Sequence, residues 1–66
     1  MKIVLNGEAR EIEGIGSVAD LIRDVRAGKG RVAVLVNDDV VLAVDRETHL
    51  LTEGDRIEII AFAAGG

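Results

Sequence analysis

Alternating apolar and polar residues open the chain. Residues 2–6 (KIVLN) form a run rich in strand-favouring side chains, and the alternation resumes over residues 9–13 after Asn6-Gly7. Asn-Gly suits the positive φ angles of a two-residue type I′ turn, while residues 6–8 fit equally well as a three-residue loop with Gly7 at its bulge. Both alternatives predict a β-hairpin at the start of the chain.

The spacing of apolar residues then changes to that of an amphipathic helix. Ser17 and Asp20 match the S/T-x-x-D/E capping signature that precedes many helices. Apolar residues follow at positions i, i+3, i+4 and i+7, and these are Val18, Leu21, Ile22 and Val25. Gly28 and Gly30 are expected to end the helix. The pattern therefore predicts one helix that buries a single apolar stripe.

The next part of the chain has the pattern of a central strand with a short neighbour. Residues 31–37 carry apolar side chains on both faces, which is typical of a strand in the middle of a sheet. The pair Asp38-Asp39 is expected to turn the chain into a short return strand over residues 40–42. A polar connection follows over residues 43–53, with a helical turn expected near residues 45–48.

A closing strand completes the regular pattern. After the turn pair Gly54-Asp55, residues 56–62 alternate, so that the odd-numbered positions share one face. The predicted fold is α+β with the order ββαβββ, in which one main helix packs across a mixed sheet of four to five strands. Residues 1–62 are expected to form this domain, and residues 63–66 a flexible tail.

The composition sets the size of the core and excludes several kinds of chemistry. The chain has 66 residues, 48% of them hydrophobic, and Phe62 is its single aromatic residue, so we expect one small aliphatic core. The lack of cysteine excludes disulfides, thiolate metal ligands and a thiol nucleophile. The single histidine, His49, has no partners for a catalytic triad, and Asp38-Asp39 lacks further oxygen ligands for a cation. We therefore expect a protein that is not an enzyme and binds no metal or cofactor.

The charge distribution indicates proteins as partners. Twelve acidic and eight basic residues give a net charge of −4, and the basic residues are scattered along the sequence. Because nucleic-acid binding needs a clustered basic surface, we expect no nucleic-acid partner. The negative charge fits attraction to basic clefts and fits the solubility of a small domain equally well. No apolar run approaches the roughly 20 residues that span a bilayer, so we expect a cytoplasmic protein without a membrane partner.

The chain ends in Gly65-Gly66, after two alanines, Ala63 and Ala64, that follow the closing strand. Glycine has no Cβ, so such a tail can pass through a channel too narrow for other residues and bring its carboxylate to the active site of a partner. The alternative is a frayed terminus without a role. We expect the carboxylate of Gly66 to be a substrate for other enzymes.

Four segments carry a resemblance that covers the whole chain: residues 1–7 (MKIVLNG), 34–37 (VLVN), 53–59 (EGDRIEI) and the final Gly-Gly. In order and spacing they resemble the ubiquitin-like β-grasp fold and, within it, the sulfur carriers of the thiamine pathway. Residues 41–44 (VLAV) depart from the family pattern, in which a proline and a basic residue often stand soon after the strand that follows the Asn turn.

The resemblance implies that the first and last strands lie side by side in the middle of the sheet. One face of the sheet would then pack on the helix stripe, through Ile3, Leu5, Val32, Val34, Val36, Ile57 and Ile59. The opposite face would show Val4, Leu35, Ile60 and Phe62. We expect Val4, Ile60 and Phe62 to bind the activating enzyme. The alternatives are scattered exposed apolar residues or the interface of a homodimer.

The family also implies the chemistry of the tail. An adenylyltransferase of the ubiquitin-activating type would join the Gly66 carboxylate to AMP, using ATP and Mg²⁺ that the partner binds. A persulfide sulfur donor would then displace AMP and leave a thiocarboxylate, which would supply sulfur to a thiazole synthase. Gly65, Ala64 and Ala63 would thread the channel of the partner, where the alanines can pair as an added strand.

Other interpretations fit the same residues. The small subunit of molybdopterin synthase shares the fold and the Gly-Gly end, and carriers for cysteine or homocysteine synthesis are compatible with the altered residues 41–44. A different class is a binding or structural module with inert glycines, or a protein modifier that conjugates to lysine. The sequence alone does not choose the pathway that receives the sulfur.

Overall fold

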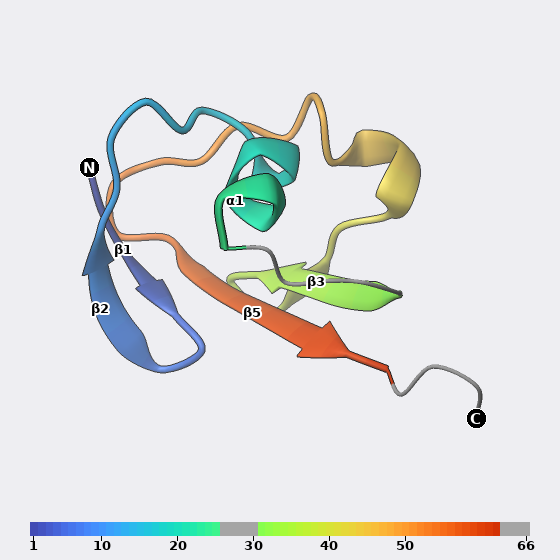
Figure 1. Cartoon of the computed structure of the whole chain (residues 1–66). Coiled ribbons are helices and arrows are strands. Elements are labelled where there is room, and N and C mark those ends of the chain that lie inside the picture. Colours follow the sequence, from blue (N-terminus) through green and yellow to red (C-terminus); the bar gives the residue numbers. More distant parts are fainter. Residues whose placement is uncertain (26–30, 63–66) are drawn as a thin grey trace.

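Five strands form one mixed sheet, and a helix packs across one of its faces (Figure 1). The computed structural model describes residues 1–25 and 31–62. In chain order the elements are β1 (Lys2–Leu5), β2 (Glu8–Glu11), α1 (Val18–Val25), β3 (Val32–Val36), β4 (Asp39–Val40), a 3-10 helix η1 (Ala43–Asp45) and β5 (Arg56–Ala61). The predicted α+β class and the order ββαβββ are confirmed.

The first and last strands are neighbours in the middle of the sheet, as expected. The strand order is β2-β1-β5-β3-β4, and β1 and β5 run parallel with Val4 opposite Arg56 and Leu5 opposite Ile57. On its other side, β5 pairs antiparallel with β3 over five residue pairs, from Val32↔Ala61 to Val36↔Ile57. The start of β5 is therefore held from both sides, and the rest of the strand is paired with β3.

The first hairpin closes through a two-residue turn. Leu5 pairs with Glu8, and the two residues between them, Asn6 and Gly7, have φ angles of 50° and 84°. Positive φ at both central positions is the type I′ geometry, which matches the right-handed twist of the strands. The structure thus selects the shorter of the two turns that the sequence allowed.

The second hairpin turns one residue earlier than the sequence suggested. Val36 pairs with Asp39, and the turn residues are Asn37 and Asp38, whose φ angles are 51° and 74°. The predicted turn at Asp38-Asp39 is therefore wrong, and the return strand is Asp39–Val40 instead of residues 40–42. Asparagine tolerates the left-handed region better than most residues, so the type I′ turn uses the Asn-Asp pair.

The helix begins at the predicted capping residues. The Ser17 hydroxyl accepts a hydrogen bond from the Asp20 backbone N–H at 3.1 Å, and the Asp20 carboxylate accepts one from the Ser17 N–H at 3.3 Å. This reciprocal pair satisfies two backbone donors that the first turn leaves without partners. The predicted helix end at Gly28 and Gly30 lies outside the described residues.

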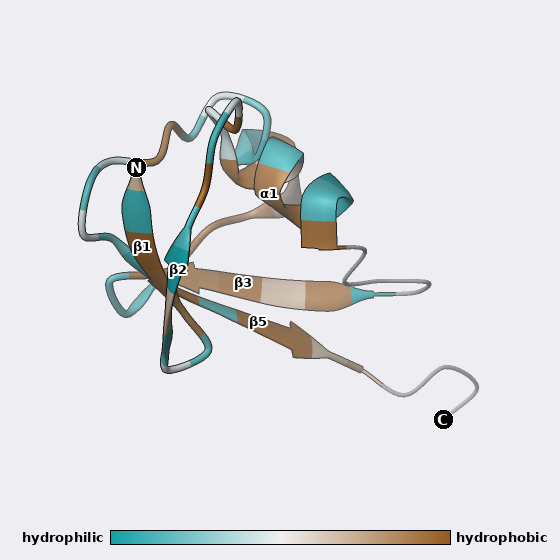
Figure 2. Cartoon of the chain, turned by 60° about the vertical axis from the view of Figure 1, so that its left-hand side comes forward, coloured by the Kyte–Doolittle hydropathy of each residue, from teal (hydrophilic) through white to brown (hydrophobic). Residues whose placement is uncertain are grey.

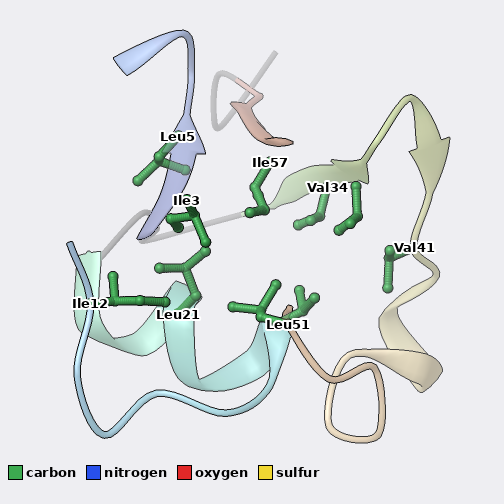
Figure 3. Packing of buried hydrophobic residues seen from close by; sticks show 10 residues of the cluster. Ile3, Leu5, Ile12, Leu21, Val34, Val41, Leu51 and Ile57 are labelled. Carbon is green, nitrogen blue, oxygen red and sulfur yellow. The ribbon is translucent and has the colours of Figure 1, made fainter. Parts of the chain in front are cut away.

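The apolar core lies between the helix and one face of the sheet (Figure 3). Its buried side chains are Ile3, Leu5, Ile12, Val18, Leu21, Val34, Val36, Val41, Leu51 and Ile57. Ile22, Val25, Val32 and Ile59 are partly buried against them, so the predicted helix stripe and inner sheet face are confirmed. Each fully buried Leu or Ile side chain contributes about 1.5–3 kcal/mol to folding.

Three core residues lie outside the observed helices and strands, although the sequence predicts Ile12 and Val41 within strands. Ile12 follows β2, Val41 follows β4, and Leu51 lies before the turn that leads to β5. The helical turn expected near residues 45–48 begins earlier, at Ala43–Asp45, and two further backbone bonds to the Asp45 carbonyl extend it. Within the described residues, no helix is long and apolar enough to cross a membrane.

Candidate functional site

The strand that leads to the tail, β5, lies in the middle of the sheet. Ile57 is 1% exposed, and the antiparallel pairing of β5 with β3 continues to Phe62, whose N–H donates to the Arg31 carbonyl at 3.0 Å. Residues 63–66 lie outside the described residues. The roles expected for Gly66, Gly65, Ala64 and Ala63 therefore stay predictions, but the strand from which they continue has a fixed place.

A buried carboxylate fixes the start of β5. Asp55 is 8% exposed and accepts hydrogen bonds from the Thr52 N–H at 2.8 Å, the Thr52 hydroxyl at 3.0 Å and the Asn37 side-chain amide at 3.0 Å. Burial by itself raises the pKa of Asp55, but these hydrogen bonds to the charged form outweigh it and hold the pKa below its ordinary value. The ionised carboxylate thus joins the turns on either side of the strand.

The outer face of the sheet, opposite the helix, carries the predicted docking residues. Ile60 is 48% exposed and Phe62 is 55% exposed, while Val4 is half-buried. Figure 2 shows the hydrophobic stretches of β3 and β5 lying next to each other in the sheet. Strand alternation places Ile60 and Phe62 on the face that the helix leaves uncovered.

The structure separates Val4 from the other two predicted docking residues. Val4 lies opposite Arg56, and Ile60 follows Arg56 by four positions, which is about 13 Å along a strand. The neighbours of Ile60 are instead on β3, where Ala33 is its direct partner. Val4 therefore shares the face of Ile60 and Phe62 without lying next to them.

Apolar residues on this face continue from β5 across β3 to β4. Leu35 lies two residues beyond Ala33 on β3, and its partner on β4 is Val40, which is 65% exposed. We call this set the outer strip, and its members are Ala33, Leu35, Val40, Ile60 and Phe62. The sequence placed Leu35 on this face, but Val40 could be placed only once the turn at Asn37-Asp38 was known.

The surroundings of Val4 are charged. Arg56 next to it forms an ion pair with Asp38, with Nη2 and Oδ2 3.3 Å apart. A shallow cavity of about 200 Å³ lies here, lined by Val4, Gly7, Asp38, Arg56, Ile57 and Glu58. The outer face is therefore polar around the first half of β5 and apolar towards the end of β5, from which the tail continues.

Residues with catalytic or metal-binding chemistry are not gathered into a centre in the part of the chain that the structure describes. No group of three His, Asp or Glu side chains is placed to hold a metal ion there. His49 lies half-buried in the connection before β5, and its backbone carbonyl accepts a hydrogen bond from the Val18 N–H at 3.0 Å. The described domain thus offers a partly apolar outer face and an anchored last strand.

Comparisons with known proteins agree on one family. The model described as "ThiS family" matches residues 3–66. A sulfur carrier protein ThiS from Thermus thermophilus is 32% identical over 62 residues, which are 94% of this chain and 95% of that protein. A thiazole synthase from Paramagnetospirillum magneticum is 33% identical over 66 residues, and the chain spans only 20% of the length of that relative.

Solved structures confirm the fold. The crystal structure of a thiamine biosynthesis protein (ThiS) from Geobacter metallireducens matches with a TM-score of 0.85 at 23% identity, over 100% of both chains. An NMR solution structure of a thiamine biosynthesis protein from the same organism matches with a TM-score of 0.80, over 100% of this chain and 88% of that one. The fold is the ubiquitin-like β-grasp that the sequence resembled.

Proposed function

The chain belongs to the ThiS family, and from this we propose that it is a sulfur carrier protein whose Gly66 carboxylate is adenylated and converted to a thiocarboxylate. The sulfur is then donated for the thiazole of thiamine. The observation that carries the proposal is the family match, which runs from residue 3 through the Gly-Gly at positions 65 and 66. The proposal requires Gly66 to be the last residue of the working protein.

The first step makes the carboxylate reactive. A carboxylate is a poor electrophile at neutral pH, so one of its oxygens attacks the α-phosphorus of ATP and pyrophosphate leaves. The product is an acyl adenylate on Gly66. ATP and Mg²⁺ are held by the partner, an adenylyltransferase of the ubiquitin-activating type, where the cation neutralises the phosphate charge.

The second step exchanges oxygen for sulfur. The terminal sulfur of a persulfide donor attacks the Gly66 carbonyl carbon, and AMP leaves with the electron pair of the bond that breaks. A thiolate then attacks the donor sulfur of the resulting acyl disulfide, which releases the Gly66 thiocarboxylate and forms a disulfide. At a thiazole synthase, the thiocarboxylate sulfur attacks the electrophilic carbon of the substrate, and hydrolysis of the thioester restores the carboxylate.

This chain supplies a reacting group and a recognition surface, and its partners supply catalysis. Gly65 gives the tail a slim profile and backbone freedom next to the reacting carbonyl. Ala63 and Ala64 keep the profile narrow for passage through a channel of the partner. The chain is therefore a protein co-substrate, which agrees with the lack of cysteine in its sequence.

Docking of the adenylyltransferase is proposed on the outer face of the sheet. The support is that Ile60 and Phe62 are about half exposed and stand at the end of β5 that leads to the tail. A partner that covers them would hold the tail at the mouth of its own active site. Val4 joins this contact only if the partner also covers the charged region around Arg56.

An exchange assay tests the proposed function. The chain is incubated with an adenylyltransferase of this type from the same organism, ATP, Mg²⁺ and labelled pyrophosphate. Because adenylation is reversible before sulfur is added, label is expected to enter ATP, and deletion of Gly66 is expected to abolish the exchange. Equal exchange with and without Gly66 would reject the requirement for Gly66 as the adenylated residue.

A further inference from the structure

The strand that leads to the tail loses one of its two neighbours halfway along. β1 ends at Leu5, so the parallel pairing with β5 comprises Val4↔Arg56 and Leu5↔Ile57, whereas β5 continues to Ala61. Beyond Ile57, pairing along β5 comes from β3 on the opposite side. The backbones of β1 and β3 thus hold β5 from both sides only up to Ile57, which is four residues before the strand ends.

The side chain of Asn6 extends that support. Its backbone N–H donates to the Ile57 carbonyl at 2.8 Å, and its side-chain oxygen Oδ1 accepts a hydrogen bond from the Ile59 N–H at 2.9 Å. At a φ angle of 50°, the backbone of Asn6 already turns away from β5 towards Gly7. The side-chain carbonyl thus takes the place of a backbone carbonyl that a longer β1 would have presented.

Asn37 forms the same pair of contacts from the other side of β5. Its N–H donates to the Arg56 carbonyl at 2.7 Å, and its Oδ1 accepts a hydrogen bond from the Arg56 N–H at 2.9 Å. Its φ angle is 51°, nearly that of Asn6. The two asparagines differ in position, because Asn37 holds the first residue of β5 whereas Asn6 holds Ile59, nearer the tail.

We propose that Asn6 is a positioning residue for the sulfur-carrying tail, and this inference rests on the proposed function. Its side-chain oxygen fixes the second half of β5, the strand from which the tail continues. After Ile59, β5 is held from the side of β3, by the pairs Ala33↔Ile60 and Val32↔Ala61 and by the bond of 3.0 Å from the Phe62 N–H to the Arg31 carbonyl. Because a strand held on both sides up to Ile59 is already ordered, less conformational entropy is lost when the partner binds the tail.

Hydrogen exchange on the free chain tests the structural part. Glycine accepts the positive φ of the turn but lacks the acceptor, so Asn6→Gly is expected to speed the exchange of the Ile59 and Phe62 amides. Asn6→Asp keeps an acceptor oxygen and tolerates the same φ, and it is expected to restore slow exchange. Acceleration confined to Ile59, or no acceleration, would overturn the proposal, because the end of the strand would not depend on Asn6.

Adenylation kinetics test the functional part. For Asn6→Gly, the KM for the chain is expected to rise about three- to tenfold, the effect of one hydrogen bond, with kcat unchanged because the bound tail reacts normally. Asn6→Asp should return KM to near the original value. The matched control is Asn37→Gly, which removes the same type of bond from the start of β5 and is expected to leave KM unchanged.

Two outcomes would overturn the inference. One is a rise in KM for Asn37→Gly equal to that for Asn6→Gly, since this would show a general loss of stability; Thr52→Val serves as the control if Asn37→Gly does not fold. The other is an unchanged KM for Asn6→Gly. If the unaltered chain is not adenylated at all, the proposed function fails, whereas the exchange rates of the free chain still decide whether Asn6 holds β5.

Discussion

The side-chain amide of Asn37 donates a hydrogen bond of 3.0 Å to the carboxylate of Asp55. Asn37 belongs to the turn after β3, and Asp55 belongs to the turn before β5. The hydrogen bond therefore joins these two turns. Thr52 adds two further donors to the same carboxylate. The last strand therefore starts from a cluster that depends on one ionised group.

The stability of the fold is expected to fall at acidic pH through Asp55. Its pKa is lower in the folded chain than in the unfolded one, so its contribution is present above the unfolded pKa of about 4 and is lost as pH falls through the folded pKa. Urea unfolding at a series of pH values checks this. Asp55→Asn should lower stability by about 1–3 kcal/mol at neutral pH and reduce the acid dependence. An unchanged acid dependence in Asp55→Asn would contradict the assignment.

Phe62→Asp is expected to weaken adenylation without unfolding the domain. Phe62 is 55% exposed, so the folded chain loses little packing, whereas a charge on the docking face opposes an apolar partner surface. The KM for the chain should rise about tenfold or more with an unchanged melting temperature. The control is Val44→Asp, since Val44 is 83% exposed in η1 and lies outside the outer strip. Equal effects of the two variants would remove the docking proposal.

Val4 is expected to matter less to docking than Ile60. Val4 lies beside the Arg56–Asp38 ion pair, whereas Ile60 lies next to Ala33 in the outer strip. Ile60→Thr should therefore weaken binding of the adenylyltransferase more than Val4→Thr does, as measured by calorimetry. A larger loss for Val4→Thr would move the docking site to the charged half of the face.

Ser17→Ala is expected to destabilise the domain and leave adenylation unchanged. The substitution leaves the Asp20 N–H without its cap, which costs about 1 kcal/mol in the free energy of unfolding. Ser17→Thr keeps the hydroxyl and serves as the control in the same urea titration. Because the helix start is on the face opposite the outer strip, a change in KM at a temperature where the variant is folded would be unexpected.

The sequence determined the element order, the helix cap and the inner sheet face because each has a local periodic or capping signal. Leu51 had no such signal, because it stands in the polar connection. Ile12 and Val41 were predicted within strands, but their burial depends on tertiary packing. The separation of Val4 from Ile60 depends on the register between β1 and β5, which a single sequence does not specify.

Some polar contacts could also not be predicted from the sequence. Arg46 stands in the polar connection, yet its Nη2 donates to the Val32 carbonyl at 2.7 Å, at a point of β3 that the short β4 does not cover. Asn6 was recognisable as a turn residue from the Gly7 that follows it, whereas Asn37 was predicted as the end of a strand. Their side-chain bonds to β5 could not be predicted, because those bonds join residues far apart in the chain.

Intact mass spectrometry of the chain purified from its own organism shows whether Gly66 carries sulfur. The expected species is heavier by the exchange of one oxygen for one sulfur, with fragment ions that place the change on Gly66. Deletion of Gly66 should abolish this species. An unmodified terminus, even after incubation with ATP, the adenylyltransferase and a sulfur source, would contradict the account.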